Sequence, residues 1–168
     1  MNPISGFPPI ATERARVLIL GSMPGLASLN AGEYYAHPRN QFWPIVCRLL
    51  GIDALLPYES RLNALNDNGI AVWDVIKDCS RSGSLDSGIV KQTIVPNDFV
   101  IFFQRHPSIR SVFFNGATAE NLFRKFYLTT TLKVCDDIRN YRRLPSTSPA
   151  NAALSLERKL EIWKLILN

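Results

Sequence analysis

Short runs of consecutive apolar residues alternate along this chain with amphipathic stretches. A run of this kind, with a turn sequence directly after it, is typical of a strand buried on both faces of a parallel sheet. Four segments fit the pattern and are predicted as strands: residues 16–20, 70–76, 109–114 and 141–144. Residues 128–134 are a candidate for an additional edge strand.

Five segments between these runs have the periodicity or the end signals of helices. The predicted helices are residues 40–50, 60–68, 99–104, 117–127 and 155–167. Gly51 and Gly69 stand where the first two helices should end, and Asn97 or Asp98 can cap the third.

The remaining stretches are expected to be less regular. Residues 27–38 and 77–88 are predicted as loops, and residues 1–12, rich in Pro and Gly, as an irregular lead-in. The last helix, in contrast, has a clear apolar stripe that should face the core. The stripe consists of Leu156, Leu160, Trp163 and Leu167.

Strands that alternate with helices predict a three-layer α/β/α sandwich with a central, mainly parallel sheet of about four strands. Neither a repeat nor a long linker divides the chain, so residues 1–168 are predicted to form one domain. In such sheets the ligand site lies outside the carboxyl ends of the strands. The site is therefore expected where four loops meet: residues 21–25, 75–82, 115–118 and 145–151.

Composition narrows the class of protein only slightly. Hydrophobic residues make up 46% and charged residues 20%, which argues against disorder. The formal net charge of +5 is compatible with nucleic-acid binding, but many other proteins have a similar excess. The chain shows neither a signal-peptide pattern nor an apolar stretch of ~18 residues, so a cytoplasmic protein without membrane contact is expected.

Cysteine and histidine spacing gives no sign of a metal centre or a disulfide scaffold. Cys47, Cys79 and Cys135 are far apart with no CxxC pair, and only His37 and His106 accompany them. The cysteines are expected to be small buried apolar residues, and His106 is interpreted as structural. No metal or organic cofactor is predicted.

Two segments carry candidate chemistry. Residues 21–25 read Gly-Ser-Met-Pro-Gly directly after a predicted strand, which by itself fits a tight turn and lacks the spacing of phosphate-binding loops. Residues 34–43 concentrate aromatic, His, Arg and Asn side chains around a proline at the mouth of a helix. Aromatic rings can stack on an extruded base, and an Asn can hold a water or read a base edge. Taken singly, each aromatic also fits core packing.

Together these blocks resemble the hypoxanthine-DNA (deoxyinosine) glycosylase family of the uracil-DNA glycosylase superfamily. The resemblance covers Gly-Ser-Met-Pro-Gly at 21–25 with Ser28-Leu29, and Tyr-Ala-His-Pro-Arg-Asn-Gln-Phe-Trp at 35–43. It continues through Gly-Ile-Ala-Val-Trp-Asp-Val at 69–75, Ser-Leu-Asp at 84–86 and Phe-Asn-Gly-Ala-Thr at 114–118. It ends with Leu-Pro-Ser-Thr-Ser-Pro-Ala-Asn at 144–151. Each block alone is a weak signal, but their order along the chain is specific.

The resemblance implies the site residues. In that family the catalytic role belongs to an Asn in the His-Pro-Arg-Asn segment, which is Asn40 here. The implied base pocket consists of Ser22, Met23, Pro24, Gly25, Tyr35, Phe42, Asp74 and Asn115. The implied DNA contacts are Ser28, His37, Arg39, Ser80, Ser146, Thr147, Ser148 and Pro149. Thr147 to Ala150 are predicted to form the wedge that enters the duplex, although a simple turn before the last helix also fits these residues.

Two positions depart from other branches of the superfamily. Ser22 replaces their acidic or amide side chain, and Leu144 replaces the His of their His-Pro-Ser loop. The first difference argues against a uracil enzyme of those branches, and the second removes the His that stabilises the departing base anion in them. Asn40 would orient the water, backbone N–H groups near Met23 and Gly25 would stabilise charge on the departing base, and Tyr35 or Phe42 would stack on that base.

Some roles stay open on the sequence alone. Asp74 can read a base edge or accept hydrogen bonds from loop amides. Asn115 fits a helix N-cap best. His37 can contact a phosphate, although bracing its own loop is favoured, and Arg39 is expected to bind a phosphate or the loop. Arg142 and Arg143 can contact DNA, but solvated surface is the more common place for such a pair.

The resemblance therefore implies a monomeric, monofunctional DNA glycosylase that acts on duplex DNA with a deaminated base, most of all hypoxanthine. One alternative is an enzyme of the same fold for uracil or G·T mismatches. Another is an inert nucleic-acid-binding module, which would not require the Asn40 segment. An unrelated hydrolase is disfavoured because the G-x-S-x-G elbow is absent.

Overall fold

The computed structural model describes residues 3–129 and 140–167. Its centre is a four-stranded sheet in the order β3-β2-β6-β7, in which all neighbouring pairs are parallel. The strands are β2 (Val17–Gly21), β3 (Ile70–Asp74), β6 (Ser111–Asn115) and β7 (Asn140–Leu144). The predicted fold class and strand count are confirmed. The two inner strands are buried almost throughout, as their continuous apolar runs require.

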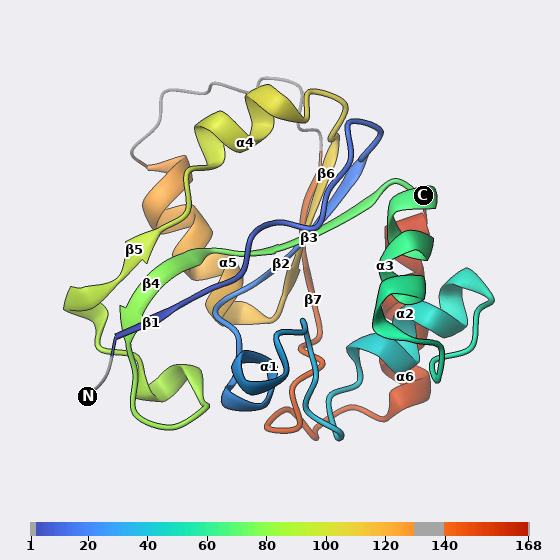
Figure 1. The fold of residues 1–168 in the computed structure, drawn as a ribbon, viewed down its shortest axis with the longest axis horizontal. Helices are drawn as coiled ribbons and strands as arrows, with labels where there is room; N and C mark the ends of the chain where they lie inside the picture. Colours follow the sequence, from blue (N-terminus) through green and yellow to red (C-terminus); the bar gives the residue numbers. More distant parts are fainter. Residues whose placement is uncertain (1–2, 130–139, 168) are drawn as a thin grey trace.

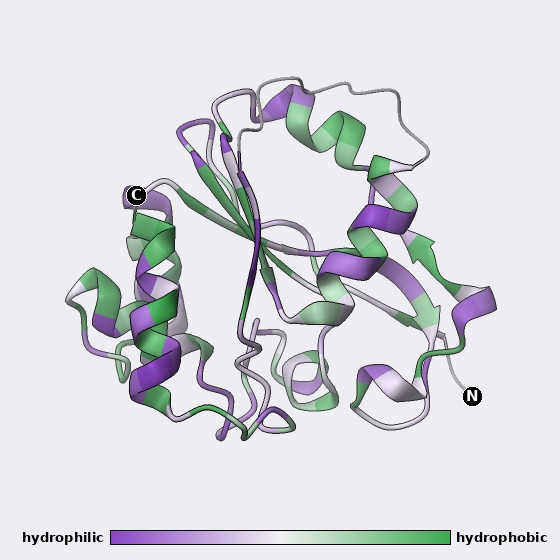
Figure 2. Cartoon of the chain, turned by 180° about the vertical axis from the view of Figure 1, so that it is seen from behind, coloured by the Kyte–Doolittle hydropathy of each residue, from purple (hydrophilic) through white to green (hydrophobic). Residues whose placement is uncertain are grey.

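Helices cover both faces of this sheet (Figure 1). One side carries α2 (Phe42–Leu50), α3 (Tyr58–Asp67) and α6 (Leu156–Trp163). The other side carries α4 (Phe99–Arg105) and α5 (Ala117–Phe123). Short helical turns complete the chain: η1 (Asp86–Gly88), η2 (Lys91–Thr93), the π-helical η3 (Arg124–Leu128) and η4 (Lys164–Leu167). Figure 2 shows mainly hydrophobic residues along the inner strands, as expected of a sheet between two helical layers.

A second sheet was not predicted. Strands β1 (Pro3–Ser5), β4 (Ile76–Ser80) and β5 (Val95–Pro96) pair antiparallel in the order β1-β4-β5. The predicted irregular lead-in is therefore wrong for β1, and the predicted loop 77–88 is wrong for most of β4 and for η1. Strand β4 was missed because only two of its residues, Ile76 and Cys79, are buried. Its sequence therefore has no continuous apolar run that would predict a strand.

Other boundaries moved by a few residues. A short helix, α1 (Leu26–Ala31), replaces part of the predicted loop 27–38. The predicted helix 40–50 begins at Phe42, and the stops at Gly51 and Gly69 are confirmed. The Asp98 side chain caps α4 by accepting the Ile101 N–H. Leu128 belongs to η3 and Thr129 to the turn that follows it, and residues 130–134 of the candidate edge strand lie outside the described residues.

The stripe of the last helix is confirmed except at its end. Leu160 and Trp163 are buried, whereas Leu167 is 50% exposed and Ile166 is buried instead. The chain tightens from α6 into the 3-10 turn η4. Because a 3-10 helix advances by three residues per turn, the buried position moves from 167 to 166. Cys47 and Cys79 are buried as expected, and Cys135 lies outside the described residues. No helix in residues 3–129 and 140–167 is long and apolar enough to cross a membrane.

The core should be highly sensitive to truncation at the inner strand β6. Phe114 has no exposed surface, so Phe114→Ala should lower the free energy of unfolding by about 3–5 kcal/mol. The matched control is Leu55→Ala, at a side chain that is 90% exposed; it should change stability by less than about 0.5 kcal/mol. Urea unfolding measures both, and equal midpoints for the two variants would contradict this description of the core.

Candidate functional site

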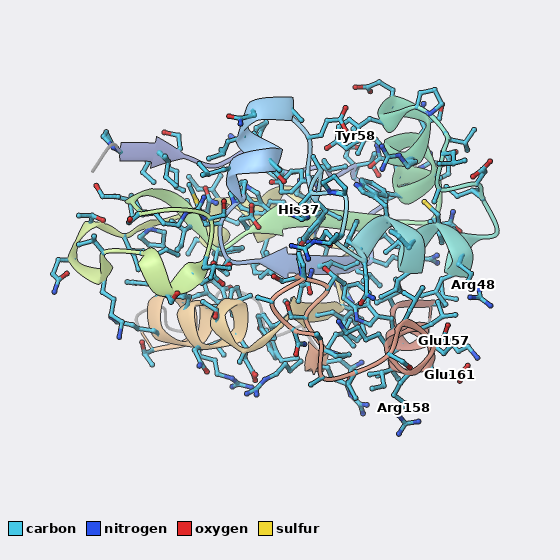
Figure 3. All side chains as sticks on the ribbon, turned by 90° about the horizontal axis from the view of Figure 1, so that it is seen from below. His37, Arg48, Tyr58, Glu157, Arg158 and Glu161 are labelled. Carbon is cyan, nitrogen blue, oxygen red and sulfur yellow. The ribbon has the colours of Figure 1, made fainter. Side chains whose placement is uncertain are left out.

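A pocket of about 540 Å³ lies at the carboxyl ends of the parallel strands, as predicted from the strand order. It takes residues from the turn after β2, the segment between α1 and α2, the end of β3, η1, the end of β6 and the loop after β7. Figure 3, which views the molecule from below, shows His37 near the centre of this face and Arg158 at its edge, pointing away. The volume is in the range of known small-molecule sites.

Most of the predicted site residues line this pocket. They are Ser22, Met23, Pro24, Gly25, Ser28, Tyr35, His37, Arg39, Asn40, Asp74, Asn115, Ser146, Thr147, Ser148 and Pro149. Phe42 and Ser80 do not. Ser80 ends β4, where its N–H donates to Thr93 Oγ1 and its carbonyl accepts from Val90 N. The structure therefore gives no support to a DNA contact at Ser80.

The aromatic residues form the floor beside Asn40. The Phe42 side chain is fully buried, and the Tyr35 ring stacks on it with centroids 3.9 Å apart. The prediction that a base can stack on Phe42 is therefore wrong, because Tyr35 lies between Phe42 and the pocket. Tyr35 itself has a positive φ of 57°, a conformation that non-glycine residues seldom adopt outside functional or strained sites.

Asn40 is held in a fixed orientation at the start of α2. Its Oδ1 accepts the Phe42 N–H at 2.9 Å, and its own N–H donates to the His37 carbonyl at 2.8 Å. The Phe42 N–H requires the oxygen on that side, so the amide cannot flip. A carbonyl oxygen has a second lone pair, so Oδ1 can still accept from a water. His37 Nδ1 accepts the Arg39 N–H at 3.1 Å, which confirms that His37 braces its loop.

The loop after β7 is fastened by a reciprocal pair of hydrogen bonds. Asn115 Nδ2 donates to Thr147 Oγ1, and Thr147 N donates to Asn115 Oδ1, both at 2.9 Å. The Thr147 carbonyl also accepts the Gln41 N–H at 3.0 Å. The N-cap prediction for Asn115 is therefore wrong, because its amide holds Thr147. Thr147 is fully buried, so its prediction as a wedge residue is also wrong.

The hydroxyl groups of the same loop remain suited to phosphate. Ser146 Oγ accepts the Ser148 N–H, and Ser148 Oγ accepts the Ala150 N–H, each at 3.2 Å. Each hydroxyl hydrogen can then be donated outward to a phosphate oxygen. The loop passes close to Gly116, where a Cβ would lie 2.9 Å from the Ser146 Cβ and where φ is 100°. Glycine at this position therefore allows the close approach of the loop.

Ser28 Oγ has a role within the fold. Ser28 is buried, and its Oγ accepts the Ala36 N–H at 3.1 Å, which ties α1 to the segment that leads to Asn40. Arg39 is exposed at the pocket rim. Arg142 and Arg143 are exposed on β7, and Arg143 pairs with Glu120 at 2.5 Å. That ion pair shows that Arg143 already has a partner on α5.

Two carboxyl groups in the pocket have opposite surroundings. Asp86 accepts the Ser22 hydroxyl with both oxygens, at 2.7 and 2.8 Å. Asp74 is buried, and its Oδ2 has no hydrogen-bond partner among the described residues. Burial, and next the Asp86 carboxylate, raises the pKa of Asp74 to about 7, and Arg81 opposes this effect. Burial and Asp74 also raise the pKa of the Tyr35 hydroxyl, so it stays protonated.

Several residues that shape the pocket were missed in the sequence. Asp86 was part of the motif at 84–86, but it fell in a predicted loop and was not assigned to the site. Arg81 is buried and donates to the carbonyls of Pro24 at 2.6 Å and Gly83 at 3.0 Å. Lys159 is buried in α6 and donates to Gln41 Oε1 and to the Asn151 carbonyl. No pattern of spacing indicates such contacts between distant segments.

The rim of the pocket carries exposed apolar side chains. Leu26 and Leu85 line the pocket and are 45% and 56% exposed, and the Leu26 N–H donates to Ser84 Oγ at 3.4 Å. This rim therefore carries large apolar side chains, whereas the loop after β7 presents only small residues. Within residues 3–129 and 140–167, no three His, Cys, Asp or Glu side chains gather in a way that could hold a metal ion.

Comparison with known proteins agrees with this geometry. The family model described as "Uracil DNA glycosylase superfamily" matches residues 8–167. A protein of Methanosarcina acetivorans named hypoxanthine DNA glycosylase is 36% identical over 165 residues, which cover 96% of each chain. One of the same name from Methanosarcina barkeri is 37% identical over 145 residues, which cover 84% of this chain and 90% of the relative.

A solved structure has the same fold over its whole length. The solution NMR structure of a candidate uracil DNA glycosylase from Methanosarcina acetivorans superposes with a TM-score of 0.75 at 32% sequence identity. The superposition covers 99% of this chain and 100% of that one. The parallel sheet, the pocket at its carboxyl edge and the match over residues 8–167 lead to one conclusion: the chain belongs to the uracil DNA glycosylase superfamily.

Proposed function

We propose that this chain, acting as a monomer, removes deaminated bases from double-stranded DNA, hypoxanthine above all, and leaves an abasic site. The observation that carries the proposal is the position of Asn40, which lines the 540 Å³ pocket with its amide orientation fixed by the Phe42 N–H. The two relatives named hypoxanthine DNA glycosylase support hypoxanthine as the base. Uracil is the second candidate, favoured by the description of the similar NMR structure.

The target nucleotide must leave the duplex to reach a pocket of this depth. Extrusion costs roughly a few kcal/mol and is easiest for a weakly paired base, which gives selectivity before the base is contacted. Ser146 and Ser148 can donate to the flanking phosphates, and Arg39 at the rim adds a positive charge. Pro149 and Ala150, with Leu26 and Leu85 on the opposite rim, can occupy the space that the base vacates.

Hydrolysis then breaks the bond between the sugar and the base. Asn40 is neutral at physiological pH and cannot take a proton, so its contribution is to orient the attacking water through Oδ1. Backbone N–H groups at the turn of Met23 and Gly25 can donate to the base carbonyl oxygen as charge develops on it. The water attacks the sugar directly, and no lysine acts as a nucleophile, so the product is an abasic site.

Removal of the Asn40 amide should abolish excision with little loss of binding. Asn40→Ala should lower the single-turnover excision rate from an inosine duplex at least about 10²-fold, since water positioning is lost, and DNA affinity should stay within several-fold. Asn63→Ala, at an exposed residue of α3, is the matched control and should keep the full rate. Asn40→Asp retains an oxygen that accepts the Phe42 N–H. It therefore separates loss of the amide in the reaction from displacement of the start of α2. Wild-type excision by Asn40→Ala would remove Asn40 from this role.

Binding should weaken steeply with salt, because phosphate contacts release counterions. Arg39→Ala should reduce the slope of log affinity against log salt by roughly one unit. Arg158→Ala, at the edge of the face in Figure 3, is the control and should leave the slope unchanged. Fluorescence anisotropy with a labelled duplex at several salt concentrations gives both slopes. Equal slopes for the two variants would argue against a phosphate contact at Arg39.

A further inference from the structure

One buried carboxyl group of the pocket, that of Asp74, has no function in the mechanism above. Asp74 stands at the last position of β3, lines the pocket and is only 4% exposed. Its Oδ2 is buried without a hydrogen-bond partner among the described residues. An unpaired buried oxygen on a carboxylate is costly, and the cost is small only if the carboxyl carries a proton or meets a ligand.

The surroundings of Asp74 oppose a negative charge there. Oδ1 packs so tightly against Gly21 of β2 that a Cβ at position 21 would collide with it. The Tyr35 hydroxyl lies 3.1 Å from the same Cβ position, so Asp74 and Tyr35 converge over Gly21. Gly21 is therefore the residue that makes room for the carboxyl group.

The charged and titratable groups that face Asp74 come from three segments. They are Asp86 from η1, Arg81 from the turn after β4, and Tyr34 and Tyr35 from the segment before α2. Arg81 donates through Nε and Nη2 to the Gly83 and Pro24 carbonyls, and its Nη1 has no partner among the described residues. Asp86 receives the Ser22 hydroxyl in both oxygens. The Ser22 hydroxyl thus stabilises a carboxylate at Asp86 and not at Asp74, where only the charge of Arg81 opposes the effects of burial and of Asp86.

We propose, on the basis of the proposed function, that Asp74 is the general acid that gives a proton to the departing purine. Two carboxyl groups in one site with opposite environments are the usual arrangement for separate protonation states. Burial and Asp86 place the pKa of Asp74 near 7, which suits proton donation at neutral pH. The Asp86 carboxyl accepts the Ser22 hydroxyl, and its charge raises the pKa of Asp74 and so favours a proton there.

The step balances as follows. The bond between C1′ and N9 breaks and its electron pair stays with the base, while the proton of Asp74 moves to an acceptor atom of that base. The base leaves as a neutral molecule, and Asp74 becomes a carboxylate. The water oriented by Asn40 forms the new bond to C1′, and the proton it releases returns to Asp74 through solvent. No oxidant, metal or other reactant is consumed.

The test is the pH dependence of single-turnover excision from an inosine duplex. A general acid is active while protonated, so the wild-type rate should be highest below pH 7 and fall as the pH rises through about 7. Asp74→Asn should reduce the rate at pH 6 by about 10²-fold and should remove this fall. Asp86→Asn removes the nearby negative charge, so it should lower the pKa of Asp74 and move the fall to lower pH.

Two controls separate this role from a structural one. Asp78→Asn changes a carboxyl in β4 that binds Ser5 and does not line the pocket; it should keep the wild-type profile. A ¹³C NMR titration of the Asp74 carboxyl reports its protonation without any activity. Titration near neutral pH, shifted downward in Asp86→Asn, supports the proposal, and titration in the ordinary range of Asp overturns it.

The outcomes also separate this inference from the proposed function. Excision of inosine by the wild-type chain, with an Asp74→Asn profile of wild-type shape, would overturn the role of Asp74 and leave the proposed function in place. If the wild-type chain excised no base, the proposed function itself would fail, and the role of Asp74 as an acid would fail with it.

Discussion

The pocket depends first on one connection between distant segments, the pair of hydrogen bonds between Asn115 and Thr147. Thr147 also accepts the Gln41 N–H, so the end of β6, the loop after β7 and the start of α2 are joined at one residue. Lys159 adds a second connection between Gln41 and the Asn151 carbonyl. Because Gln41 follows Asn40 directly, these contacts fix the distance between the Asn40 segment and the loop proposed to grip DNA.

Burial gives this connection its strength. Thr147 and Lys159 are almost fully buried, and buried polar groups are costly to leave unpaired. Burial also lowers the pKa of the Lys159 ammonium, so its two acceptors matter for holding the charge. A loop fastened in this way is already ordered before DNA arrives, and little binding free energy is spent on ordering it.

The central sheet was predicted well from the sequence, because strands buried on both faces have continuous apolar runs. The order of these strands also indicated at which edge of the sheet the site lies. The prediction failed for β4, which is half-solvated and so lacks such a run. The sequence also did not predict which residues of the site are buried behind the pocket wall. Only the packing shows that Phe42 lies beneath Tyr35 and that Thr147 is internal. Spacing along a chain cannot distinguish a residue that lines a pocket from one directly behind it.

The sequence likewise does not show how the polar side chains of the site are held. Resemblance placed Asn40 at the site, and the structure adds how its amide is held. The contrast between Asp74 and Asp86 is invisible in the sequence, since it depends on which carboxyl receives the Ser22 hydroxyl. Asp74 Oδ2 has no hydrogen-bond partner among the described residues and lies in the pocket wall. A buried polar atom of this kind is expected where a ligand completes the hydrogen bonding, and here the ligand would be the edge of the extruded base.

The most direct test is excision from four labelled duplexes that carry inosine, xanthine, uracil or no lesion, followed by alkaline cleavage of any abasic site. We expect cleavage of the inosine duplex above the other three. Cleavage of the uracil duplex alone would keep the superfamily mechanism and replace the proposed substrate. If no duplex were cleaved while the protein still bound DNA, the account of this pocket as a catalytic site would be contradicted.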